Sequence, residues 1–172
     1  MAFDTFLKLE GGSTPVDGEA TRKGHEGWIE VYSFSFGASN PTTVGTGQTG
    51  LSAGKVSVSS FNIMKKTEAS SAHLFAACCQ GTHFKKATVV LNKASGDKEK
   101  PLPFLTYKFT DVMVESVQWS GSTGGDDTPT ESISFAFAKV EILYAQQSSE
   151  KGGQAKTHGA SWDLTTAAAT TS

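Results

Sequence analysis

The chain has 172 residues, of which 37% are hydrophobic and 18 are glycine, and its formal net charge is −2. This length is sufficient for one domain with a substantial core. The near-neutral charge argues against a nucleic-acid partner, which would require a dominant basic surface. No segment is apolar over enough residues for insertion into a membrane.

The ends and cysteines indicate where the protein folds. The opening MAFDTFLKLEGG lacks a basic lead followed by an apolar run, so we expect no secretory signal peptide. The two cysteines, Cys78 and Cys79, are adjacent and do not readily bridge each other. This pair fits a reducing cytosol and argues against a thiolate metal site.

Period-two patterns rich in β-branched and aromatic residues predict strands along most of the chain. In chain order they cover residues 3–9, 28–36, 55–63, 87–93, 102–119 and 131–144. The stretch 102–119 is too long for an ordinary strand, so we expect a bend or bulge near Asp111 and Val112. Residues 158–164, HGASWDL, are a candidate short edge strand, and residues 165–172 are expected to form a mobile tail.

One segment, SSAHLFAACCQG at residues 70–81, has a helical pattern. Ser70 or Ser71 is a candidate N-cap, and Gly81 is a candidate residue for the left-handed position after the helix. We therefore expect one short helix packed on a β structure.

Two glycine-rich loops contain motifs that resemble binding sites. GTGQTG, within the uncharged loop at residues 37–54, has the spacing of a dinucleotide-binding turn, but a strand-like segment follows where that motif needs a helix. The acidic residues of GGDDTPTE do not have EF-hand spacing, and a solvated hairpin loop is the favoured interpretation. The four histidines show no metal-ligand spacing, so we expect no metal, cofactor or catalytic site.

The strand ESISFAFAKVEILY exchanges its apolar face midway. Ile133, Phe135 and Phe137 share one face, whereas Val140, Ile142 and Tyr144 share the other. Strand side chains alternate strictly, so a strand with one buried face does not produce this pattern. Either a bulge switches the faces, or the second face meets the helix or a neighbouring subunit.

Long segments of the chain resemble the Hcp family, the haemolysin-coregulated proteins that form the tube of bacterial type VI secretion systems. They are HEGWIEVYSFSFG, SAGKVSVSSFNIMKKTEASSAHLFAACCQGTHFKKATVVLNKASG and PTESISFAFAKVEILY, and the opening MAFDTFLKLEG fits as well. The resemblance is collinear and covers nearly the whole chain. It implies a mainly β fold: a β-barrel of two antiparallel sheets with one short flanking α-helix, similar to phage tail-tube proteins. A single domain would then span residues 1–164, followed by the tail.

The resemblance also implies a function. Family members are non-enzymatic tube subunits that form homohexameric rings stacked inside a contractile sheath. The implied partners are other copies of the chain, a VgrG-type spike protein, the sheath and baseplate, and secreted effectors carried or chaperoned in the lumen. The protein would be cytoplasmic before firing and then reach the medium or a target cell without a signal peptide.

Two sets of residues are candidates for roles in such a ring. Tyr32, Phe34 and Phe36 are expected to face the core, so Ser33 and Ser35 on the opposite face would line the lumen or, alternatively, the ring exterior. The candidates for the assembly interface are Val140, Ile142, Tyr144, Gly45, Gly47 and Gly50. The alternative function is a secreted β-sandwich module that binds a ligand or carbohydrate through Trp28, Trp119 and Trp162.

Overall fold

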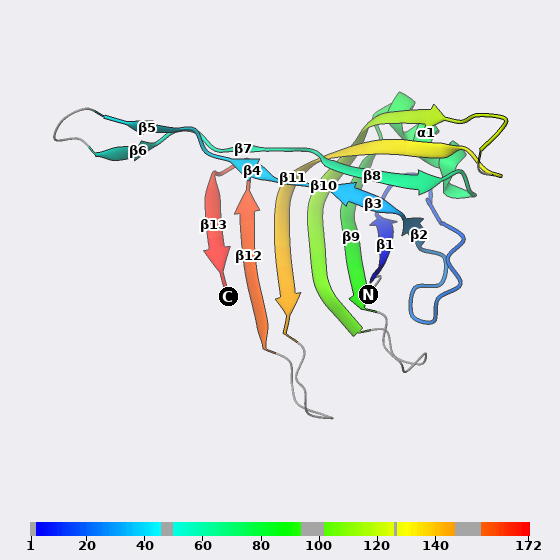
Figure 1. The fold of residues 1–172 in the computed structure, drawn as a ribbon, viewed down its shortest axis with the longest axis horizontal. Helices are drawn as coiled ribbons and strands as arrows, with labels where there is room; N and C mark the ends of the chain where they lie inside the picture. Colours follow the sequence, from blue (N-terminus) through cyan, green and yellow to red (C-terminus); the bar gives the residue numbers. More distant parts are fainter. Residues whose placement is uncertain (1–2, 46–49, 94–101, 126, 147–155) are drawn as a thin grey trace.

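The structure is a computed structural model that describes residues 3–45, 50–93, 102–125, 127–146 and 156–172. These residues form mostly β-strands and one α-helix (Figure 1), which confirms the predicted fold class. The elements are β1 (Phe3–Glu10), β2 (Ile29–Val31), β3 (Ser33–Ser35), β4 (Ala38–Ser39), β5 (Thr42–Val44), β6 (Leu51–Ala53), β7 (Ser57–Val58), β8 (Phe61–Lys66), α1 (Ser70–Gln80), β9 (His83–Lys93), β10 (Leu102–Ser120), β11 (Thr130–Ala145), β12 (Thr157–Asp163) and β13 (Ala168–Thr171).

Nine strands form one antiparallel sheet. Seven follow the order β13-β12-β11-β10-β9-β1-β2, and a branch leaves at β11, where β8 pairs with β11 and β3 pairs with β8. In Figure 1 this branch runs across the other strands, and buried side chains from both parts belong to one hydrophobic cluster. The chain joins the two parts at Tyr32, whose backbone N–H donates to the Met64 carbonyl at 2.8 Å.

This topology corrects one detail of the prediction. We expected two antiparallel sheets closed into a barrel, whereas one large sheet bends back over its own core and the described strands do not form a closed barrel ladder. Two small two-stranded sheets, β4–β7 and β5–β6, extend from this body.

Three neighbouring strands exchange their buried face along a single line across the sheet. The core-facing residues on either side of this line are three positions apart in each strand: Phe84 and Ala87 in β9, Phe109 and Val112 in β10, and the half-buried Phe137 and the buried Val140 in β11. The register places Phe84, Val112 and Phe137 side by side, and likewise Ala87, Phe109 and Val140. We call this row the face-exchange line.

The backbone of β10 accommodates the exchange. Asp111 lies on the line with a positive φ of 55°, and a register shift against β11 follows between Val114 and Ser116. The predicted irregularity near Asp111 is confirmed, although β10 continues through it as one strand of 19 residues. Both apolar faces of residues 131–144 therefore contact the core of this same chain. Before the face-exchange line, the face of Ile133 and Phe135 points inward, and after it the face of Val140 points inward.

The segment at residues 28–36 also changes phase, which the sequence did not predict. Ile29 and Val31 are buried, whereas Phe34 and Phe36 pack against the core from the opposite phase. Tyr32, expected in the core, is 59% exposed. The reason is that the chain bends at Tyr32, where it stops pairing with β1 and starts pairing with β8.

Helix α1 is confirmed, but its start differs from the expectation. Neither serine caps it, because the helix begins at Ser70 and Ala69 occupies the cap position without a side-chain bond. Glu68 substitutes by accepting the Ser70 N–H at 3.3 Å. Gly81 ends the helix in the left-handed conformation, as predicted, with φ of 65°.

The C-terminal residues belong to the sheet. The candidate edge strand is β12, and residues 165–172, expected to be a separate tail, contain β13, which pairs with β12 from Ala168 to Thr171. The sequence did not predict this strand because Ala and Thr at four consecutive positions show no apolar alternation. The ladder hydrogen bonds of an edge strand need no such pattern.

Candidate functional site

A hairpin with one charged residue, Lys55, projects from the body of the molecule (Figure 1). It consists of β4 and β7 at its base and β5 and β6 further out, and we call it the arm. Val44 is 78% exposed and Leu51 is 72% exposed, although they are the large apolar residues of the outer ladder. Gly45 and Gly50 flank them, and Gly47 lies outside the described residues. An apolar end on a projecting element is typical of a surface that meets another protein.

A second surface is uncharged and rich in hydroxyl groups. It consists of outward-facing residues of β3, β8, β11 and β10, which the register arranges in two rows: Ser33, Met64, Ser132 and Gln118, then Ser35, Asn62, Ser134 and Ser116. The Ser134 hydroxyl donates to Asn62 Oδ1 between neighbouring strands. We call this surface the hydroxyl face. Ser33 and Ser35 are exposed on it, opposite the buried side of their strand, as predicted.

Directly behind the hydroxyl face lies a buried ionic cluster that the sequence analysis missed. Lys65 Nζ is 2.8 Å from Glu131 Oε2, and both side chains are fully buried. The same ammonium group is 3.2 Å from Glu68 Oε1 and donates to Ser71 Oγ at 3.0 Å. Glu68 in turn accepts the Glu19 backbone N–H at 2.8 Å. The cluster therefore joins two strands, the start of α1 and the segment before β2.

A signal for this cluster was present in the sequence. Lys65 continues the phase of Phe61 and Ile63, and Glu131 shares the phase of Ile133 and Phe135. Two opposite charges on the apolar faces of two strands indicate a buried pair if those strands are neighbours. The sequence alone did not show that β8 and β11 pair.

Residues 11–28, which we call the N-terminal strap, connect β1 to β2, and the side chains of His25 and Arg22 contact β1. His25 is 8% exposed and stacks on Phe6, with ring centroids 4.9 Å apart. Its Nε2 lies 2.8 Å from Asn92 Nδ2, while Arg22 donates to Asp4 at 3.0 Å. Burial, together with the nearby Arg22 charge, lowers the pKa of His25 below its ordinary value. The imidazole is therefore held neutral near pH 7 and works as a packing group.

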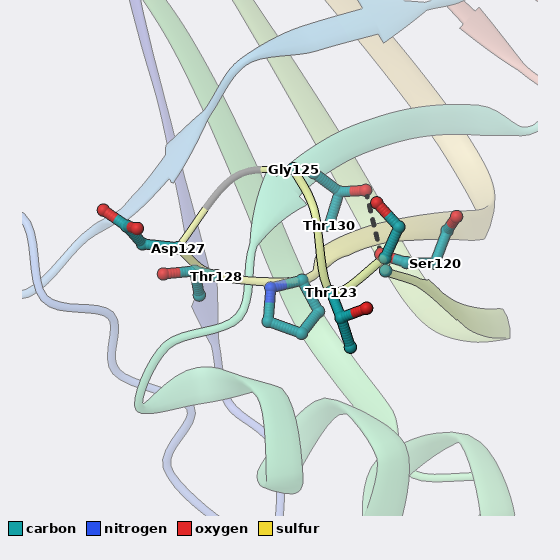
Figure 2. A pocket seen from close by; sticks show the side chains of 9 residues that line it. Ser120, Thr123, Gly125, Asp127, Thr128 and Thr130 are labelled. Atoms are coloured by element: carbon teal, nitrogen blue, oxygen red, sulfur yellow. Dashed lines mark hydrogen bonds between the residues drawn. The ribbon is translucent and has the colours of Figure 1, made fainter.

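The loop between β10 and β11 forms an open hollow (Figure 2). Thr130 Oγ1 donates to the Ser120 carbonyl at 3.3 Å, and the Asp127 side chain points away from that bond (Figure 2). The lining of the hollow is rich in hydroxyl groups, and Asp127 supplies the one carboxylate among its described residues. This arrangement agrees with a solvated hairpin loop. Within the described ranges, no group of three His, Cys, Asp or Glu side chains is arranged to hold a metal ion.

The predicted interface residues of β11 do not form one surface. Val140 is 4% exposed and belongs to the core, so its assignment to an assembly interface is wrong; the face-exchange line turns it inward. Ile142 packs against the core, half-buried. Tyr144 alone is well exposed, at 44%. The structure therefore leaves Tyr144 and the arm as candidates for contact with another molecule.

The three tryptophans of the alternative function have separate surroundings. Trp28 contacts His25, Trp119 contacts Phe75 of α1, and Trp162 packs against the core beside β11. They do not form the shared aromatic platform that a carbohydrate-binding face would need.

No helix in the described part of the chain is long and apolar enough to cross a membrane.

The chain is similar to known proteins of the Hcp family. A family model described as "Type VI secretion system effector, Hcp" matches residues 6–144. Protein hcp1 of Pseudomonas aeruginosa is 34% identical over 150 residues, covering 87% of this chain and 88% of that protein.

Solved structures agree with these sequence matches. A structure described as a type six secretion system protein is 38% identical, with a TM-score of 0.86, and the match covers 98% of this chain and 100% of the other. The crystal structure of Hcp1 from Salmonella typhimurium is 30% identical, with a TM-score of 0.75, over 99% of this chain and 100% of the other. The chain therefore belongs to the Hcp family of the type VI secretion system.

Proposed function

We propose that this protein is a tube subunit that assembles head to tail into homohexameric rings. The rings stack within a contractile sheath on a baseplate, and contraction ejects the tube together with a VgrG-type spike protein. The protein is cytoplasmic before firing and reaches the medium or a target cell afterwards. Its work is structural: it defines a channel and transmits thrust.

The observation that carries this proposal is the arm. It extends beyond the core that stabilises the rest of the chain, and its residues are exposed throughout β4, β5 and β6. Burying Val44 and Leu51 would stabilise an association by about 1.5–3 kcal/mol each. A head-to-tail contact needs one patch on each subunit to meet a different patch on the next, and the arm supplies one of them.

The hydroxyl face supports the second part of the proposal, a lumen that carries or chaperones effectors. Small hydroxyl and amide groups keep a channel wall wettable and free of fixed charge, so passengers of different charge can pass. Ser33 and Ser35 are the residues we assign to this wall. Their small side chains keep the channel wide.

The experiment that tests the assembly is light scattering on the purified protein. A ring gives a mass about six times that of one chain, and electron microscopy shows an annulus. A single-chain mass at micromolar concentration refutes the proposed assembly.

The arm has its own test in the double substitution Val44→Ser, Leu51→Ser. The monomer fold is expected to persist because neither side chain contributes to the core, while the assembled fraction falls. The matched control is Leu164→Ser, which removes an exposed leucine elsewhere, at 41% exposure. Equal assembly by both variants contradicts the role of the arm.

The lumen assignment is tested by Ser35→Gln, which adds bulk on the hydroxyl face without touching the core. The ring is expected to persist, while co-purification of a lumen-bound effector falls. Loss of the ring would place Ser35 in an interface. Ready modification of Ser35→Cys in intact rings by a reagent too large for the lumen would place it outside.

A further inference from the structure

Strand β13 forms an open end of the large sheet. It is the last strand of the hydrogen-bonded order, and all four of its residues are exposed. In the part of the chain that the structure describes, no strand pairs with its outer edge. The other end of the order, β2, runs directly into β3 and thus into the branch. The sheet is therefore open at β13.

The hydrogen-bond pattern identifies which backbone groups of β13 are free. Ser172 and Gly159 exchange two backbone bonds, at 2.8 and 2.9 Å. Such pairs alternate with unbonded pairs along an antiparallel ladder, and Thr171 and Ala169 stand opposite Ala160 and Trp162. Ala169 and Thr171 therefore direct their N–H and C=O groups away from β12.

The β13 edge lacks most of the features that prevent edge strands of monomeric proteins from pairing with other chains. Charged side chains, prolines and bulges normally block pairing with other chains, whereas Ala168–Thr171 contains only alanine and threonine. The adjoining β12 is also exposed at Thr157, His158 and Ala160. An additional strand would meet neither charge nor steric obstruction here.

The arm presents a matching pair of free edges. Gly54 donates to the Pro41 carbonyl at 2.7 Å and Gly45 to the Gly50 carbonyl at 3.1 Å, so the bonded pairs fall at every second position. The backbone N–H and C=O groups of Thr42 and Val44 therefore point away from β6, toward the free edge of β5. Ala169 and Thr171 of β13 are likewise two positions apart and face outward, and neither β5 nor β13 contains a charged residue.

We propose that the free edge of β13 binds the arm of a second copy of this chain by adding a strand to the sheet. Two outward residues on each side can exchange up to four backbone hydrogen bonds. The inference rests on the proposed assembly and names the contact that the arm makes in it. It assigns the Ala/Thr tail a role as the receiving edge.

A proline test removes donors without touching the core. In the double variant Ala169→Pro, Thr171→Pro, the lost N–H groups point away from β12, a position that edge strands tolerate. We expect an unchanged circular dichroism spectrum and association at least tenfold weaker by light scattering. The matched control, Ala169→Thr, keeps its N–H and should associate like the unmodified protein.

A cross-link test identifies the occupant. Copies carrying Ala169→Cys are mixed with copies carrying Thr42→Cys, both with Cys78→Ser and Cys79→Ser, and then oxidised. A disulfide between these positions can join only two different copies, so a covalent dimer is expected from the mixture and not from either variant alone.

The outcomes separate this inference from the proposed function. If the unmodified protein has the mass of a single chain, both the proposed ring assembly and the β13 contact are wrong. If the proline variant forms rings equally well, or if the cysteine variants give no mixed dimer, the β13 contact is wrong and the proposed tube function is not affected.

Discussion

Lys65 is a single buried cation on which several segments depend. Taking charges out of water is costly, and the pair with Glu131 offsets this only while both partners are present. The Lys65 ammonium, 2.8 Å from Glu131 Oε2, is the compensating group, because no other described side chain or backbone group donates a hydrogen bond to either Glu131 oxygen.

We predict that Lys65→Ala lowers the free energy of unfolding by about 3–5 kcal/mol, because the Glu131 carboxylate is left buried without its counter-charge. The double variant Lys65→Met, Glu131→Leu should be much closer to the unmodified protein. Urea denaturation measures both. The control is Lys8→Ala, which breaks an exposed contact to Glu10 at 3.9 Å and should cost less than about 1 kcal/mol. Similar values for Lys65→Ala and Lys8→Ala would contradict the role of the cluster.

His25 makes stability depend on pH. The pKa of the His25 imidazole is lowered in the folded protein by burial and by Arg22. Below about pH 6.5 the imidazole is therefore more often protonated in the unfolded chain than in the folded chain. The free energy of unfolding should therefore fall as the pH drops from about 7 towards the lowered pKa, by at most about 1.4 kcal/mol per pH unit from this group. His25→Gln should flatten this part of the profile, whereas the exposed His73→Gln should retain it. An identical pH profile for His25→Gln would contradict the assignment.

At the scale of elements, the face-exchange line shows where sequence patterns were informative and where they were not. The exchange in residues 131–144 was visible because Phe137 and Val140 are three positions apart. The same spacing exists at Phe109 and Val112, but Thr110 and Asp111 between them resemble an ordinary exposed stretch. Whether the second apolar face of a strand is buried within the chain depends on which strands pair with it and on where the core lies. Neither can be read from the residues of that strand alone.

We predict opposite effects for two substitutions at Asp111, which has φ of 55°. Asp111→Val should cost about 1–2 kcal/mol, because a β-branched residue is strained in the left-handed region. Asp111→Gly should be nearly neutral, since glycine adopts this conformation freely and the exposed contact to His83 contributes little. Thermal unfolding measures both, with Thr110→Val as the control at a neighbouring exposed site. A destabilising Asp111→Gly would show that the aspartate side chain, not the backbone, matters.

The helix and most strands of the large sheet were predictable because alternation and turn residues are local signals. Four features were not predicted: the strands β4, β5 and β6 within the loop at residues 37–54, the bend at Tyr32, the pairing of β13, and the buried position of Lys65. Each depends on which strands become neighbours. For the candidate site, the sequence identified the exposed serines and the loop that forms the arm, but it assigned Val140 to an interface.

At the scale of the whole molecule, one core serves both the seven-strand run and the branch. A single shared core favours unfolding in one cooperative step. Trp28 lies in the N-terminal strap, Trp119 on β10 and Trp162 on β12, so tryptophan fluorescence samples separate regions. For a dissociated monomer we predict that fluorescence and far-ultraviolet circular dichroism give coincident urea transitions. Separate midpoints would show that β12 and β13 unfold independently of the body.

The face-exchange line also limits how the length of this chain can vary. Three adjacent strands change phase together, so an insertion or deletion of one residue between Phe84 and Ala87, or at the matching places in β10 and β11, would invert one strand relative to its neighbours. Charged side chains such as Lys86 and Lys139 would then face the core. Gains and losses of residues are better tolerated in the connections between strands, where no neighbouring phase has to be matched.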